Sequence, residues 1–135
     1  MDSIKPYIIE LPKVLDERGN LSFFEYPGQI PFEIKRTYWI YDVPGGEVRG
    51  SHAFKEQQEF IVALSGGFDV ILHNGEEETK FHLNRSYYGL FIPNKIWRSL
   101  ENFSTNSTAL IVSDSAYAED DYIRDFEDFK LMTNG

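Results

Sequence analysis

Short segments of apolar, or alternating apolar and polar, residues recur along the chain and are separated by turn-forming clusters such as DERGN, PGGE, HNGEE and STNS. Segments this short and this evenly spaced are typical of β-strands in a barrel or sandwich, not of alternating strands and helices. The Asn-Gly pair at 74–75 lies between two of them and favours a hairpin. The segments predicted as strands are 7–11, 21–26, 35–43, 58–66, 68–73, 79–83, 87–93, 97–103 and 108–114.

The end of the chain has a different period. In residues 118–132 the acids come early, and helical spacing relates Tyr122, Ile123, Phe126, Phe129 and Lys130. Asp120 and Asp121 are interpreted as charges at the start of this helix. The pattern predicts an all-β barrel with a short C-terminal helix packed on it. With 135 residues, 16% aromatic content and no repeat or linker, the chain is expected to form a single domain over residues 1–135.

Charge and cysteine content exclude several classes of protein. A net charge of −9 argues against a partner that is nucleic acid or a membrane surface, because phosphate repels such a protein. No run approaches the roughly 18 apolar residues of a membrane span, and the N-terminus does not resemble a secretory leader. The absence of Cys excludes disulfides and thiolate nucleophiles and fits a reducing cytoplasm, which is the expected location. Six arginines remain available to hold an anionic ligand.

A motif lies in the segment GGEVRGSHAFKEQQEFIVALSGG. Gly46, His52, Glu59 and Gly66 follow the spacing G-x5-H-x-H-x3/4-E-x6-G, except that Phe54 stands at the second histidine. This is the first motif of cupin barrels. Side chains two apart on one strand point the same way, and the Glu of the next strand points into the same barrel mouth.

The companion cupin motif, which ends P-x-G-x2-H-x3-N, is also present in altered form. Pro93, Lys95, Arg98 and Asn102 have its spacing, with Lys for Gly and Arg for the metal-binding His, while its leading Gly is displaced to Gly89. Two linked motifs indicate a cupin jelly-roll barrel.

The two substitutions bear on metal binding. Phe54 and Arg98 replace two of the four usual ligands, and His52 with Glu59 alone cannot complete a coordination shell beside a fixed guanidinium. We therefore expect no metal and no other cofactor. Arg98 instead predicts a site for an anion or an oxygen atom.

A narrower resemblance extends over about residues 12–130. The segments RTYWIYDVPGGEVRGSHAFK, YGLFIPNKIWRSLENFS and SDSAYAEDDYIRDFEDF resemble the WxcM-like family of sugar-nucleotide 3,4-ketoisomerases, which act on dTDP-4-keto-6-deoxy-D-glucose. The resemblance implies a metal-free homodimer with exchanged N-terminal strands. It also implies a product that feeds an aminotransferase making 3-amino-3,6-dideoxyhexoses for surface glycans.

Moving a carbonyl from C4 to C3 through an enediol requires a base, an acid and a group that stabilises the enediolate. His52 matches the first His of the family's HAHK and is predicted to be the base. The second His of the family is Phe54 here, so His52 is expected to act alone, with Tyr38 or water moving the oxygen-bound proton. Arg98 is predicted to polarise the ketone or stabilise the enediolate, the alternative being an ion pair at the barrel edge.

The remaining candidates are predicted to bind substrate: Arg18, Arg49, Lys55, Glu59 and Trp97. Arg49 and Lys55 are candidates for the diphosphate, and Arg18 matches a family position that faces the ligand. Lys55 is equally interpreted as a solvated lysine, and Tyr38 as a core residue. His73 and His82 are interpreted as a pair across the 74–75 hairpin.

Three other functions are alternatives to the ketoisomerase. A non-catalytic sugar-nucleotide-binding cupin that lost activity with its second His stays open, as does a related dTDP-sugar epimerase, although the epimerase motifs are absent. A metal-dependent dioxygenase fails on ligand count. The sequence leaves open whether the product has galacto or gluco stereochemistry at C4.

Overall fold

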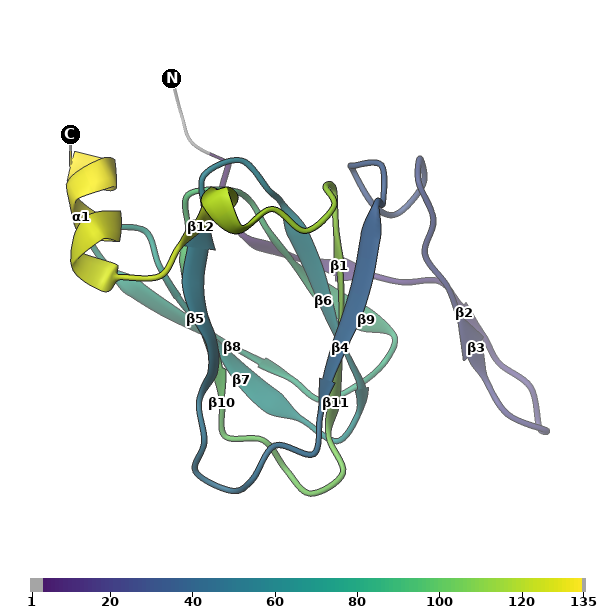
Figure 1. The fold of residues 1–135 in the computed structure, drawn as a ribbon. Helices are drawn as coiled ribbons and strands as arrows, with labels where there is room; N and C mark the ends of the chain where they lie inside the picture. Colours follow the sequence, from purple (N-terminus) through teal and green to yellow (C-terminus); the bar gives the residue numbers. More distant parts are fainter. Residues whose placement is uncertain (1–3, 135) are drawn as a thin grey trace.

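The computed structural model describes residues 4–134 and contains two five-stranded antiparallel sheets that face each other (Figure 1). One sheet has the order β1-β9-β6-β11-β4, the other the order β12-β5-β10-β7-β8, and β2 and β3 form a separate hairpin. The elements are β1 (Tyr7–Glu10), β2 (Lys13–Val14), β3 (Leu21–Ser22), β4 (Arg36–Tyr41), β5 (Arg49–Phe54), β6 (Glu59–Ser65), β7 (Phe68–His73), β8 (Glu78–Leu83), β9 (Tyr88–Ile92), β10 (Trp97–Glu101), β11 (Thr108–Ser113), the 3₁₀ turn η1 (Glu119–Asp121), β12 (Tyr122–Ile123) and α1 (Phe126–Asn134).

The main core lies between the sheets, where alternate side chains of both meet. It is built from aliphatic and aromatic side chains, among them Ile61, Val70, Leu90, Leu100 and Ile111. A second cluster covers part of the outer face of the sheet whose edge strands are β1 and β4, called the β1–β4 sheet below. There Ile30 and Phe32, from the segment before β4, pack on Phe60 and Val112. This arrangement confirms the predicted all-β jelly-roll barrel.

Most predicted strands are confirmed, but the sequence pattern missed β2, β5 and β12, and the predicted strand 21–26 is reduced to the two residues of β3. The omission of β5 matters most, because this strand carries His52. Its sequence RGSHAF contains Gly, Ser and a polar inward-facing His, so it lacks the alternation of large apolar side chains by which strands are found.

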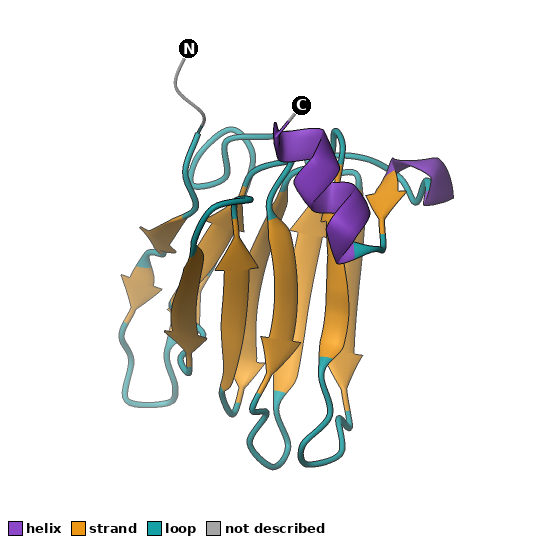
Figure 2. Cartoon of the chain, turned by 90° about the vertical axis from the view of Figure 1, so that its left-hand side faces the viewer, coloured by secondary structure: helices purple, strands orange, loops and turns teal. Residues whose placement is uncertain are grey.

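The predicted helix over residues 118–132 is wrong in its first half. Tyr122 and Ile123 form β12, which pairs with Phe54 and Ala53 of β5, and α1 begins only at Phe126 (Figure 2). The carboxylate of Asp125 accepts hydrogen bonds from the backbone amides of residues 127 and 128, as an N-cap does. This cap, three residues after β12 begins, sets the start of the helix.

Two further interpretations of acids and histidines are corrected. The carboxylate of Asp121 does not start a helix but accepts hydrogen bonds from the backbone amides of residues 56 and 57, which fixes the turn between β5 and β6. His73 and His82 do not pair, because the β7–β8 register places His82 opposite Asp69 and His73 opposite Glu78. The sequence shows which residues flank a turn but not how many residues the turn contains, and that number sets the register.

Within residues 4–134 the structure has no helix that is both long and apolar enough to cross a bilayer.

Candidate functional site

His52 lies near the end of β5, on the face of the strand that points between the two sheets. The register places it directly opposite Arg98 of β10. Its side chain is only 7% exposed, and its ring packs edge-on against Phe54 and Tyr122 at centroid distances of 4.8 and 4.9 Å. The buried Nε2 atom has no hydrogen-bond partner among the described residues. The imidazole is thus fixed by aromatic packing while one ring nitrogen stays available.

Arg98 is 1% exposed and is held by three groups inside the barrel. Its Nε and Nη2 donate to Oε1 of Glu59 at 3.1 and 2.8 Å, Nη2 also donates to the Tyr38 hydroxyl at 2.9 Å, and Nη1 donates to the Gly50 carbonyl at 3.1 Å. Tyr38 in turn donates to the other Glu59 oxygen. The three side chains from β10, β6 and β4 therefore form one closed hydrogen-bonded network.

Gly50 makes room for this network. Its φ of +64° lies in the left-handed region, and a Cβ atom built there would collide with Nη1 of Arg98. Any other residue at position 50 would therefore displace the guanidinium as well as strain the backbone. The close approach between Gly50 and Arg98 explains why a glycine precedes the site histidine by two residues.

The electrostatics of the site set the protonation states of its groups in the absence of substrate. Burial, followed by the positive charges of Arg98, Arg124 and Arg36, lowers the pKa of His52 to about 2. Burial and the Glu59 charge raise the pKa of Tyr38. Burial by itself lowers the pKa of Arg98, but Glu59 and Tyr38 reverse this and hold the pKa above its ordinary value. At neutral pH the site contains a neutral imidazole beside a fixed guanidinium.

The arrangement does not fit a metal ion at the cupin position. Both oxygens of Glu59 are already bound by Arg98 and Tyr38, so the carboxylate is not free to act as a ligand. Across residues 4–134, no three His, Asp or Glu side chains gather closely enough to form a metal-binding group.

The predicted substrate-binding residues are dispersed. Trp97 points to the outside of β10 and packs on Phe126 and Phe129 of α1, away from His52. Lys55 donates through Nζ to the backbone carbonyl of residue 120 and so anchors η1. Arg49 is exposed at the start of β5, and the register places it opposite Leu100, two positions along β10 from the residue opposite His52. Of these predicted residues, Glu59 alone lies in the buried network.

Arg18 also lies outside the His52 cluster. It occupies the turn between β2 and β3, its side chain is 90% exposed, and it is paired with Asp16 at 2.9 Å. In Figure 1 this hairpin projects away from the barrel. Within one chain, Arg18 therefore does not line the site between the sheets.

The structure adds two residues that sequence reasoning did not place at the site, namely Tyr122, which packs on His52, and Arg36, which donates to Tyr122. In the described residues, the buried side-chain nitrogen and oxygen atoms that lack a hydrogen-bond partner belong to His52, Arg36 and Gln57. Period-2 alternation puts Arg36 on the same face of β4 as Tyr38, which is a signal that the sequence already contained. The helix predicted over residues 118–132 gives no indication that Tyr122 contacts His52.

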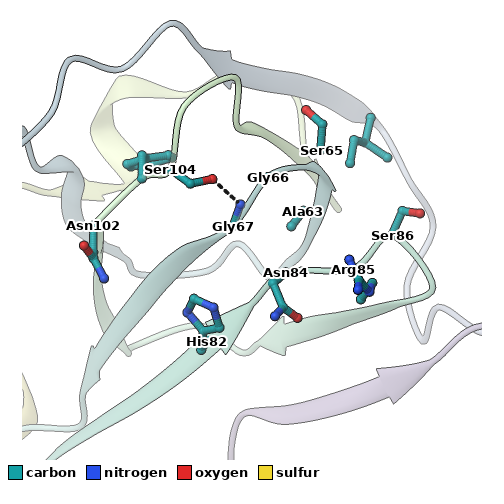
Figure 3. Close-up of a pocket in the computed structure, with 12 residues that line it drawn as sticks. Ala63, Ser65, Gly66, Gly67, His82, Asn84, Arg85, Ser86, Asn102 and Ser104 are labelled. Atoms are coloured by element: carbon teal, nitrogen blue, oxygen red, sulfur yellow. Dashed lines mark hydrogen bonds between the residues drawn. The ribbon is translucent and has the colours of Figure 1, made fainter.

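A separate pocket lies away from His52. It has a volume of about 580 Å³ and lies at the other end of the barrel, between the β6–β7 turn and the segment after β8 (Figure 3). Its polar lining includes Asn84, Arg85, Ser104 and His82. His82 is held by the buried carboxylate of Asp69 at 2.6 Å, so it has a structural partner of its own. None of the residues around His52 lines this pocket.

Comparison with known proteins gives one consistent result. The family described as FdtA, WxcM-like, C-terminal, matches residues 4–134. A curated relative, the TDP-4-oxo-6-deoxy-alpha-D-glucose-3,4-oxoisomerase of Aneurinibacillus thermoaerophilus, is 36% identical over 123 residues, which are 91% of this chain and 88% of the relative.

Two solved structures of related enzymes match this chain over nearly their whole length. A 3,4-ketoisomerase from Helicobacter canadensis has a TM-score of 0.95 at 36% identity and covers 98% of this chain and 100% of its own. A histidine-to-asparagine mutant of the 3,4-ketoisomerase QdtA from Thermoanaerobacterium thermosaccharolyticum, in complex with TDP-4-keto-6-deoxyglucose, has a TM-score of 0.94 at 28% identity, with coverages of 98% and 96%.

Proposed function

Since the chain belongs to the FdtA family of WxcM-like proteins and is an isomerase, we propose that it converts TDP-4-keto-6-deoxyglucose into the TDP-linked 3-keto-6-deoxyhexose. The substrate is the compound bound to a related ketoisomerase. The observation that carries the proposal is the neutral, buried His52 with a free Nε2 beside the Arg98 network.

The proposed reaction needs no external oxidant or reductant. His52 removes the proton from C3, and the electron pair of that bond forms the C3–C4 double bond of an enediol. The proton then returns to C4 on the same face, while the C3 hydroxyl loses its proton and becomes the new carbonyl. The oxygen-bound proton moves to O4 through Tyr38 or a water molecule. Arg98 lies opposite His52, and its charge is balanced by Glu59. Its proposed role is to donate a hydrogen bond to the developing enediolate, an interaction that a dry site makes effective.

Phe54 gives a specific reason to consider a second function. The ring occupies the position of the second family histidine and is nearly fully buried against His52 and Tyr122. A chain without that second acid could bind the nucleotide sugar without converting it. Turnover separates the ketoisomerase from such a binding protein.

We predict that incubation of the protein with TDP-4-keto-6-deoxyglucose yields the 3-keto isomer, and NMR detects its formation. In deuterated water the product is expected to carry deuterium at C4, because the proton held by the imidazole exchanges with solvent before it is returned. Treatment with EDTA is expected to leave the rate unchanged, since Glu59 is engaged by Arg98. Tight binding of TDP without any isomer formed would establish the binding protein instead.

The assembly is proposed to be a homodimer with exchanged N-terminal strands. In the single chain β1 pairs with β9, and the hairpin formed by β2 and β3 carries exposed Val14, Leu15 and Leu21. The outer face of the β1–β4 sheet exposes the large side chains of Trp39, Tyr41 and Leu64. A second copy can bury both apolar surfaces, which a monomer would leave in water.

Light scattering is expected to give the mass of a dimer, and Trp39→Glu is expected to shift the protein towards monomer by placing a charge in the apolar contact. Leu131→Glu is the matched control, because Leu131 is also an exposed apolar residue but lies on α1. A monomeric wild-type protein at micromolar concentration would contradict the assembly.

A cytoplasmic location and a single domain over residues 1–135 are proposed as well.

A further inference from the structure

The pocket at the far end of the barrel from His52 has a polar lining that carries a positive charge. Its volume of about 580 Å³ lies within the roughly 300–1,000 Å³ that is typical of small-molecule sites. Although 22 of the 135 residues are acidic, none of the described residues that line it is Asp or Glu. Arg85 lines the pocket and forms no ion pair with any acid of residues 4–134. An acidic protein can therefore receive an anion at this position.

A buried carboxylate holds two side chains of the pocket in place. Asp69 of β7 is buried, and its two oxygens bind Nδ1 of His82 at 2.6 Å and Nδ2 of Asn102 at 3.1 Å. Burial by itself raises the pKa of Asp69, but these hydrogen bonds and the charge of Lys80 hold the pKa below its ordinary value. A buried charge is costly, and this one orients two residues that are themselves exposed at the pocket. Side chains held from behind in this way are typical of binding sites.

The same hydrogen bonds decide which donors and acceptors the pocket offers. Because the ionised Asp69 carboxylate accepts from Nδ1 of His82, the neutral ring presents its Nε2 atom as an acceptor. The side-chain oxygen of Asn84 accepts from the Tyr88 hydroxyl at 2.7 Å, which leaves the amide NH₂ group as a donor. The neighbouring guanidinium of Arg85 has donors only. The pocket thus combines two donor side chains, one of them charged, with an imidazole acceptor.

These three side chains lie along one side of the pocket, and the turn between β6 and β7 forms the opposite wall (Figure 3). This wall is tightly packed. The backbone amide of Gly67 donates to the hydroxyl of Ser104 at 2.9 Å. Gly66 has a φ of +63°, and a Cβ atom built there would collide with the hydroxyl oxygens of Ser104 and Ser107. The pocket is therefore formed in advance of any ligand.

From this arrangement we propose that the far pocket is a second binding site, for a small anion that also carries hydroxyl groups, such as a sugar phosphate or a sugar acid. Arg85 and Asn84 donate to the anionic group, which a guanidinium recognises equally as phosphate or carboxylate. The Nε2 atom of His82 accepts a hydrogen bond from a hydroxyl of the same molecule. The site shares no residue with the His52 cluster, so it does not rest on the proposed function.

The chain has three histidines, so NMR of their ring signals reports on the two ends of the barrel separately. Glucose 1-phosphate and glucuronate are titrated beside two partial probes, sulfate, which lacks a hydroxyl, and glucose, which lacks a charge. At least one sugar anion is expected to shift the His82 signals saturably and to bind at least about 10-fold more tightly than either partial probe. A response to only one of the two identifies the group as phosphate or carboxylate. No response of His82, a response of His52 alone, or sulfate binding as tightly as the sugar anions would overturn the proposal.

Variants assign the contacts. Arg85→Gln is expected to weaken the binding of the sugar anion about 10- to 100-fold, as for loss of a charge-assisted hydrogen bond, and to keep the melting temperature because Arg85 is exposed. Arg124→Gln is the matched control, since it removes the same charge beside His52 and is expected to leave the His82 response unchanged. In calorimetry, His82→Phe is expected to weaken the sugar anion but not sulfate, because only the hydroxyl contact is lost. Wild-type affinity in Arg85→Gln, or equal losses in the two arginine variants, would contradict the assignment.

Discussion

The His52→Asn variant is expected to turn over TDP-4-keto-6-deoxyglucose about 10²- to 10⁴-fold more slowly than the wild-type protein, which is the usual contribution of a positioned general base. The buried Nε2 of the imidazole has no partner among residues 4–134, and burial with the nearby arginines lowers its pKa, so the ring is unprotonated at physiological pH before the reaction. The side-chain amide of Asn is too weak a base to remove a proton from carbon. The measurement is kcat from NMR time courses.

Two controls accompany this variant. TDP affinity should be unchanged, because the base is not a phosphate contact. Adding Phe54→His to His52→Asn is not expected to restore turnover, since position 54 lies against Tyr122 two residues further along β5. Near-normal turnover by His52→Asn would rule out the single-base mechanism.

The second large effect concerns stability. The Glu59→Gln variant is expected to lose about 3–5 kcal/mol of unfolding free energy, because it leaves the fully buried Arg98 without a negative partner. Combining Arg98→Met with Glu59→Leu removes both charges, and the double variant is expected to recover most of that loss. Urea denaturation followed by tryptophan fluorescence measures both.

The exposed ion pair between Arg124 and Glu119 is the comparison for this effect. Both side chains are more than half exposed, so Glu119→Gln is expected to change the unfolding free energy by about 1 kcal/mol or less. If Glu59→Gln were no more destabilising than Glu119→Gln, the buried network would not contribute to stability as argued.

The predicted site residues that the structure brings together are those whose positions depend on local periodicity. Alternation within β6 and β10 puts Glu59 and Arg98 on inward faces, and the structure joins them. The same rule, applied to β10, excludes Trp97 from the inner face, since its neighbour Arg98 points inward. The prediction for Trp97 followed the motif rather than the alternation.

The residues that were missed depend on contacts between distant segments. Tyr122 reaches His52 only because a two-residue strand pairs with the end of β5, which interrupts a helical pattern. Arg36 reaches Tyr122 across 86 positions of the sequence. His82 faces Asp69, not His73, because of the register of one hairpin.

The sequence alone therefore determined the all-β class, the cupin spacing around His52 and the replacement of a metal-binding histidine by Arg98. Each of these is recorded in residue type and short spacing, which follow from the period of a strand. Only the tertiary structure decided that Arg98 is neutralised by Glu59, that Arg36 is not neutralised by any described acid, and that Phe54 and Tyr122 enclose the base. Strand register and sheet packing settle these contacts, because the burial of the whole core fixes both together.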